Sequence, residues 1–166
     1  MSAKIIQIAQ LQAAYSGSYS FTVTHEPDPD YRKYLARQLR DVLPQVEDRL
    51  PADAIPLDIS LDDLEGDVVA GLSAVTHHET LYIDMLWVGE PLRGQGIGRR
   101  LMQMAEEQAM DRGCTLARVR VTSAVAFYVG MNYAIAGTVQ TVPFRAGGGA
   151  PAQAQSIYYL TKTIGW

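Results

Sequence analysis

The chain has 166 residues, of which 48% are apolar and 19% charged, and its formal net charge at pH 7 is −4. This composition is that of an ordinary soluble domain with enough apolar residues for a core. No basic run is interleaved with aromatic residues, and glutamines interrupt the apolar residues near the start, so we expect no nucleic-acid binding, membrane span or secretory signal.

The single cysteine, Cys114, excludes an intrachain disulfide and a multi-cysteine metal site. We therefore expect a cytoplasmic protein in which this cysteine is a buried structural thiol. The three histidines, His25, His77 and His78, do not have the spacing of metal ligands, and no metal is predicted.

The first 50 residues predict an extension, a strand and a helix. Residues 3–14 carry a weak helical pattern, and we expect residues 1–20 to pack as a helical N-terminal extension on a domain that spans residues 21–166. Residues 20–25 are rich in β-forming side chains and predict the first strand. A helix capped by Asp28 or Asp30 is expected next, with Pro44 kinking or dividing it.

The rest of the chain predicts a three-stranded meander, a central helix and a group of shorter elements. The expected meander strands are residues 57–61, 67–76 and 81–88. The expected later elements are a helix at 97–112, a strand at 115–122, a helix at 123–131, and strands at 135–142 and 156–163. We expect Gly113 to end the central helix, and Met102, Met104 and Met110 to fill the core.

A glycine-rich turn connects the third meander strand to the central helix. Such a turn directs several unpaired backbone N–H groups and the positive end of the helix dipole at one point, which favours a bound anion. Arg93, Arg99 and Arg100 add positive charge there. The turn therefore predicts a binding site for the pyrophosphate group of a cofactor. Its residues are Arg93, Gly94, Gln95, Gly96, Ile97, Gly98 and Arg99.

Two other interpretations of this turn stay open. A dinucleotide-binding turn has the spacing G-x-G-x-x-G and an acidic residue about 20 residues later, whereas this chain has G-x-G-x-G and no carboxylate from Cys114 to Arg120. Glycines also occur where a helix merely packs closely on a strand, but close packing does not account for three arginines at the start of one helix.

A second motif, from Ser123 to Tyr133, contains the adjacent aromatic residues Phe127 and Tyr128. Together, the two motifs resemble the GNAT acetyltransferase superfamily, which has Arg-x-x-Gly-x-Gly after a strand and A-x-x-F-Y-x-x-x-G-F in its fourth helix. Here Asn132 stands at the usual glycine and Tyr133 at the usual phenylalanine. Because asparagine is the next-best residue after glycine for ending a helix in the left-handed conformation, we expect Asn132 to adopt that conformation and end the helix.

The resemblance covers residues 21–163 and implies the GNAT fold, an α+β domain with a mixed, mostly antiparallel twisted sheet of six or seven strands and helices on both faces. Strands four and five of that fold, here residues 81–88 and 115–122, would run parallel and splay apart, with acetyl-CoA in the opening. The implied contacts of acetyl-CoA outside the glycine turn are the backbone groups of Leu86, Trp87 and Val88 and the residues Ser123, Phe127 and Tyr128.

The resemblance also implies direct attack of an acceptor amine on the thioester. Tyr128 matches the family's general acid, and a tyrosine hydroxyl is protonated at neutral pH; an aromatic residue that only packs is the alternative. A base must accept a proton from the amine, and the nearest carboxylate is Asp84, a lone acid in the apolar strand LYIDMLWV. A merely structural Asp84 is an open alternative, and Glu79, Glu90 and His78 are weaker candidates for the base.

The sequence therefore predicts an N-acetyltransferase that uses acetyl-CoA and a small-molecule or peptide amine, with a non-catalytic acyl-CoA-binding module as the alternative. The acceptor is left open. Residues 26–67 carry twelve acidic against five basic residues, which favours a cationic acceptor through steering, whereas Arg145 would suit an acceptor carboxylate. A homodimer is expected only by analogy with the family.

Overall fold

The computed structural model describes residues 4–6, 19–39, 51–141 and 154–165. The strands are β1 (Lys4–Ile6), β2 (Ser20–Thr24), β3 (Ile55–Asp62), β4 (Val68–His77), β5 (Thr80–Val88), β6 (Leu116–Val121), β7 (Ala134–Thr141) and β8 (Gln155–Thr163). The helices are α1 (Pro29–Gln38), the 3-10 turn η2 (Glu90–Leu92), α2 (Ile97–Asp111) and α3 (Val125–Val129).

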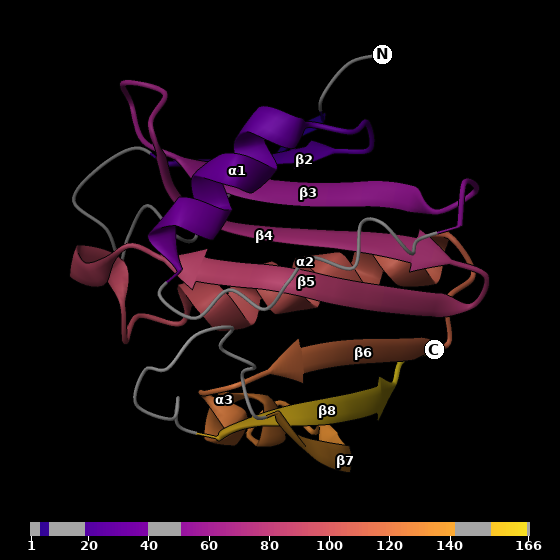
Figure 1. Ribbon diagram of the computed structural model, residues 1–166. Coiled ribbons are helices and arrows are strands. Elements are labelled where there is room, and N and C mark those ends of the chain that lie inside the picture. Colours follow the sequence, from indigo (N-terminus) through magenta and orange to yellow (C-terminus); the bar gives the residue numbers. More distant parts are fainter. Residues whose placement is uncertain (1–3, 7–18, 40–50, 142–153, 166) are drawn as a thin grey trace, which may run out of the picture.

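The eight strands of the described residues form one sheet in the order β1-β2-β3-β4-β5-β6-β8-β7 (Figure 1). Within the described residues, β5 and β6 are parallel and every other neighbouring pair is antiparallel. The predicted mixed, mostly antiparallel sheet is confirmed. Strands β2 to β8 supply the seven expected strands, and β1 adds one that was not expected.

Strand β1 corrects the expectation of a helical N-terminal extension for the three residues that it contains. Lys4–Ile6 pairs antiparallel with β2, with Ile5 opposite Thr22. An edge strand offers unpaired N–H and C=O groups, and β-branched isoleucines suit a strand, so pairing outweighs the weak helical pattern here. Residues 7–18 of the extension lie outside the described residues.

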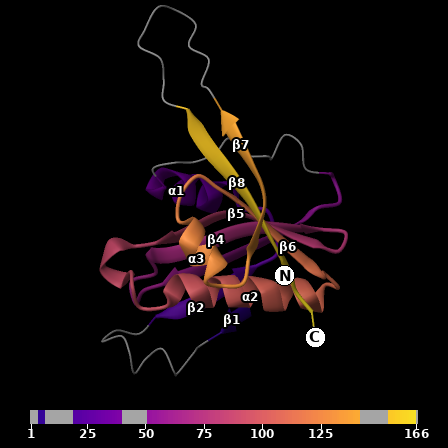
Figure 2. The same ribbon diagram turned by 90° about the horizontal axis from the view of Figure 1, so that it is seen from below.

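Helices cover both faces of the sheet, as predicted, with α1 on one face and α2 on the other (Figure 2). The buried stripe of α2 contains Ile97, Leu101, Met104, Ala105 and Ala109. Met102 is also buried and Met110 packs against the core, which confirms these methionines as core filler. Gly113 has φ +86° and ends α2 as predicted.

Helix α1 packs closely on β4 and β5. Asp28 caps it by accepting a hydrogen bond from the Tyr31 N–H at 2.9 Å, as one of the two predicted caps. The Tyr31 hydroxyl lies 2.8 Å from the Ile59 carbonyl oxygen, over Gly71, where any side chain would collide with it. Gly71 therefore sets how closely α1 approaches the sheet. Pro44 lies outside the described residues.

None of the described helices is long and apolar enough to cross a membrane.

Candidate active site

The parallel strands β5 and β6 pair only over their first four residues, from Thr80 opposite Leu116 to Ile83 opposite Val119. Beyond that point β6 follows β8, whereas β5 stays with β4. The β4–β5 register shifts at this level, so that Asp84 is an extra residue in β5. Such a bulge bends a strand, and it directly follows the last β5–β6 pair. The two strands diverge toward one end (Figure 1). The predicted splay is therefore present.

A cavity of about 120 Å³ lies between the diverging strands. It is lined by β5 residues from Ile83 to Leu86, by residues 119–124 including Ser123, by Leu39 of the α1 end, and by Tyr128 of α3. Of the predicted catalytic residues, both Asp84 and Tyr128 line it. The structure thus brings the two together at one opening, although they are 44 residues apart in the chain.

Tyr128 is 5% exposed, and burial raises the pKa of its hydroxyl to about 12. The edge of its ring meets Phe127, with the ring centroids 5.0 Å apart. Among the described residues, the Tyr128 hydroxyl has no hydrogen-bond partner. A buried tyrosine usually has such a partner, so this hydroxyl is left available at the cavity.

The glycine turn before α2 leaves open space at two of its glycines, next to the uncapped start of the helix. Gly94 and Gly96 have φ values of +73° and +83°, and a Cβ added at either residue would meet no atom within 4 Å. Helix α2 begins at Ile97 with no side-chain cap and no acidic residue in its first turn, so its first N–H groups lack acceptors within the helix. The open space and the unpaired donors suit an anionic group such as a pyrophosphate.

Gly98 differs from the other two glycines of the turn. A Cβ here would lie 3.4 Å from Phe127 Cζ and 3.7 Å from Val88 Cγ2. Gly98 therefore allows α2, α3 and β5 to pack together. Close packing, which was one alternative explanation of the turn, accounts for Gly98 but not for Gly94 and Gly96, which face open space.

Two of the three predicted arginines, Arg93 and Arg99, connect the glycine turn to neighbouring elements. Arg93 Nε donates to the Val88 carbonyl oxygen at 2.9 Å, and both terminal nitrogens of Arg99 lie 3.5 Å from the Gly130 carbonyl oxygen. Arg100 instead pairs with Glu107 at 3.6 Å. Arg93 and Arg99 therefore connect the turn to β5 and to the end of α3, next to the predicted contacts Val88 and Phe127.

Asn132 ends α3 in the way that the sequence predicts. It has φ +68°, its N–H bonds to the Val129 carbonyl oxygen at 3.0 Å, and the Tyr133 N–H bonds to the Tyr128 carbonyl oxygen at 3.0 Å. This pair of hydrogen bonds is a Schellman motif with asparagine in the usual glycine position. It anchors the backbone of Tyr128 beside the cavity.

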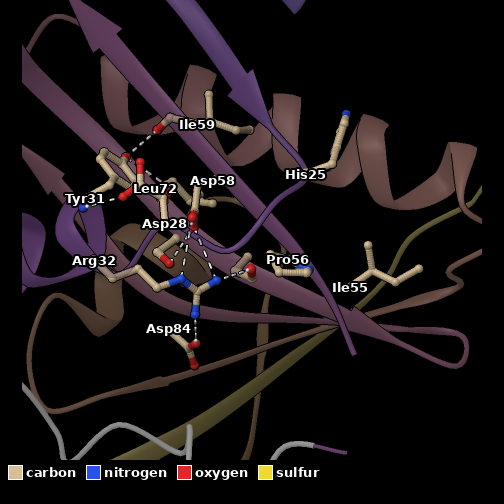
Figure 3. Close-up of polar contacts among 12 residues, drawn as sticks. His25, Asp28, Tyr31, Arg32, Ile55, Pro56, Asp58, Ile59, Leu72 and Asp84 are labelled. Atoms are coloured by element: carbon tan, nitrogen blue, oxygen red, sulfur yellow. Dashed lines mark hydrogen bonds and ion pairs between the residues drawn. The ribbon is translucent and has the colours of Figure 1, made fainter. Parts of the chain in front are cut away.

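Asp84 belongs to a buried ionic network that the sequence analysis did not find (Figure 3). Arg32 of α1 is 8% exposed and lies between Asp84 of β5, at 3.9 Å, and Asp58 of β3, at 3.3 Å. Ser73 Oγ donates to Asp58 at 2.7 Å. Burial raises the pKa of Asp58, and Arg32 and Ser73 act in the opposite direction.

The predicted strand at residues 57–61 is present within β3, but its polar residue Asp58 is only 3% exposed because Arg32 of α1 lies against it. The only sequence signal was an acid that alternates with apolar residues in that strand.

The other candidates for a base lie away from the opening. Glu79 and His78 belong to the turn before β5, at the end where β5 and β6 are still paired. Glu90 lines a separate hollow with Trp87 and Arg93. Among the acidic residues that the structure describes, Asp84 is therefore the one that lines the opening.

The predictions for Cys114, metals and Arg145 have different outcomes. Cys114 is 3% exposed, which confirms a buried thiol. Among the described residues, Asp63, Glu65 and Asp67 bring carboxylates within 4.8 Å of one another on a turn, but exposed acids of this kind are common without a metal, and the absence of a metal stays a prediction. Arg145 and the rest of residues 142–153 lie outside the described residues.

Two parallel strands that part beside an uncapped, glycine-started helix are the arrangement that the family resemblance implies for acyltransferases that take their acyl group from coenzyme A. Comparison with known proteins agrees. The family model described as "Acetyltransferase (GNAT) family" matches residues 8–133, more than half of the chain. The chain therefore belongs to the GNAT family and is a GNAT-type N-acetyltransferase.

Individual relatives are consistent with this assignment. The chain is 32% identical over 111 residues to "Acetyltransferase Atu2258" of Agrobacterium fabrum, a match that spans 67% of this chain and 76% of that protein. It is 32% identical over 81 residues to a blasticidin-S acetyltransferase of Streptomyces morookaense, across 47% of this chain and 60% of the relative.

A GNAT family acetyltransferase of Elizabethkingia anophelis, solved with acetyl-CoA bound, shares the fold at a TM-score of 0.59 and 14% identity, over 87% of this chain and 98% of that one.

Proposed function

We propose that the protein transfers an acetyl group from acetyl-CoA to a primary amine of a small molecule or peptide, by direct attack in a ternary complex. The observation that carries this proposal is Tyr128, a buried residue whose hydroxyl has no hydrogen-bond partner among the described residues and which lines the cavity beside the splayed strands. A module that only binds acyl-CoA would have no need of such a hydroxyl.

The donor site would be built mainly from backbone. The uncapped start of α2 and the open space at Gly94 and Gly96 suit the pyrophosphate of acetyl-CoA. The β5 residues Leu86, Trp87 and Val88 lie beyond the last β5–β6 pair, where they would hold the pantetheine arm. Bound there, acetyl-CoA supplies an activated acyl group as a thioester.

Two side chains would then handle protons. Tyr128 Oη holds a proton that it donates to the sulfur as the carbon–sulfur bond breaks, because its raised pKa keeps it protonated at neutral pH. Asp84 accepts the proton that the acceptor ammonium group releases before nitrogen attacks. Arg32 keeps the Asp84 carboxylate oriented at the rim of the cavity.

Titration of the purified protein with acetyl-CoA, followed by thiol-release assays with amines, tests the proposal. Micromolar binding and amine-dependent thiol release would support it. Binding without release for any amine would instead favour the acyl-CoA-binding module. A protein that does not bind acetyl-CoA would remove the proposal altogether.

Replacing Asp84 with asparagine is expected to lower kcat/KM at pH 7 by about 10²-fold, the lower end of the usual contribution of a general base. Asparagine keeps the size of the side chain but accepts no proton. The deficit should shrink as the pH approaches the pKa of the acceptor amine, because more of the amine is then already unprotonated. Steady-state rates from pH 6 to 10 measure this, with the exposed Asp111→Asn as the control. An Asp84→Asn protein that is fully active at every pH would dismiss Asp84 as the base.

A further inference from the structure

A second cavity, of about 480 Å³, lies on the face of the sheet opposite α2. Residues of β5, β6, β7 and β8 line it, and its polar side chains include Tyr82, Asp84, Arg118, Arg120 and Tyr159. Asp84 and Arg120 also line the cavity between the splayed strands. The two cavities therefore share these lining residues, and the second one lies beside Asp84, which would receive the acceptor amine.

The strand register explains how charges are arranged in the second cavity. Tyr82 of β5 is opposite Arg118 of β6, and Arg120 is opposite Tyr159 of β8. Residues two apart in a strand point to the same face, so Arg118 and Arg120 share one wall. Asp84, two residues beyond Tyr82, stands at the β5 side. The cavity thus has two guanidinium groups on one side and one carboxylate on the other.

Arg118 is exposed, and within the described part of the chain it has no hydrogen bond or ion pair. In contrast, Arg112 of the α2 end donates to the carbonyl oxygens of Ile55 and Pro56 and to Thr76, and so connects parts of the fold. Arg118 has no comparable structural role in the described residues. Its guanidinium group is positioned to meet a ligand in the cavity.

The described acids of the segment that suggested a cationic acceptor do not line this site. None of the described acids between residues 26 and 67 lines either cavity, and Asp58 is already paired with Arg32. Asp62 accepts hydrogen bonds from Thr22 and Ser60 in the β2–β3 pair, toward the edge of the sheet that is away from β5 and β6. The charges of the described lining residues therefore favour an anion next to the amine, and not a second cation.

We propose that Arg118 and Arg120 bind an anionic group of the acceptor, so that the amine acetylated by this enzyme carries a carboxylate or a phosphate a few bonds from its nitrogen. This inference rests on the proposed function, because it places the amine at Asp84. Guanidinium groups bind either anion through paired, charge-assisted hydrogen bonds. Tyr82 and Tyr159 provide aromatic surface for the carbon skeleton between the two charged ends.

Acetylation rates for amines that differ only in charge test this inference. Phenylalanine is compared with phenylalaninamide, and O-phosphoethanolamine with ethanolamine, which separates a carboxylate from a phosphate; putrescine serves as the cationic amine. The wild-type protein is expected to prefer the anionic member of one pair by at least about tenfold in kcat/KM. Arg118→Gln and Arg120→Gln should reduce that preference toward one, mainly through KM. Lys33→Gln, which removes one exposed charge from α1, should leave it unchanged.

The outcomes separate this inference from the proposed function. If neutral amines or putrescine react as fast as the anionic amines, or if both arginine variants keep the wild-type preference, the inference is wrong while the acetyltransferase activity stands. If acetyl-CoA binds but no anionic amine reacts, the inference is also wrong. If acetyl-CoA does not bind, the proposed function itself fails.

Discussion

Replacing Tyr128 with phenylalanine is expected to lower kcat by about 10²- to 10⁴-fold, the usual contribution of a general acid, with little change in the Kd for acetyl-CoA. The substitution removes one oxygen from a ring that is 5% exposed and leaves the ring packed against Phe127. Because the hydroxyl has no hydrogen-bond partner among the described residues, no buried acceptor loses its donor. Single-turnover thiol release with saturating acetyl-CoA measures the loss directly.

Tyr133→Phe is the matched control for Tyr128→Phe. Tyr133 is 2% exposed and lies in the same segment, but its hydroxyl donates to Glu106 Oε1 at 2.8 Å. Removing this hydroxyl is expected to cost about 1–3 kcal/mol of unfolding free energy and to change kcat little. If the two variants had the opposite pattern, with Tyr128→Phe fully active and less stable, Tyr128 would be a packing residue and not the acid.

The pH dependence of the wild-type enzyme gives a further check on Tyr128. A pKa raised to about 12 by burial means that its hydroxyl stays protonated throughout the range from neutral pH to about pH 10. Loss of protonated Tyr128 is therefore not expected to reduce activity in that range. A decrease in activity centred near pH 9 would therefore have to come from the titration of another group.

Local features of the site were predictable from the sequence because they depend on single residues. Glycines at positive φ in the turn and an asparagine at a left-handed helix exit are requirements of the backbone, visible in Gly94, Gly96 and Asn132. The splay followed from the family resemblance. These features fix where the donor site and Tyr128 lie.

The ionic network around Asp84 was not predictable, because it depends on contacts between distant parts of the chain. Arg32 is 26 residues from Asp58 and 52 from Asp84 in sequence, and no short-range pattern reports that they share one buried position. The bulge that makes Asp84 an extra residue depends on the pairing of β4 with β5. The pairing of β1 with β2 was missed for the same reason.

Replacing Gly96 with glutamate is expected to weaken acetyl-CoA binding by about 100-fold or more, since a carboxylate near a bound pyrophosphate is repelled by several kcal/mol at protein-surface dielectric constants. Isothermal titration of the wild type and the variant measures the difference. The deficit should shrink at high ionic strength, because salt screens the repulsion between the two anions.

Gly96→Ala is the control that separates charge from backbone strain. Gly96 has φ +83° and open space around its Cβ position, so both variants bear the same cost of a left-handed non-glycine residue, about 1–2 kcal/mol. Glutamate at the start of a helix also interacts favourably with the helix dipole, so the glutamate variant should fold at least as well as the alanine variant. Equal loss of binding in both variants would point to the backbone conformation alone. If the glutamate variant kept the wild-type affinity for acetyl-CoA, the pyrophosphate would have to bind elsewhere, because the glutamate carboxylate would repel a dianion bound at the start of α2.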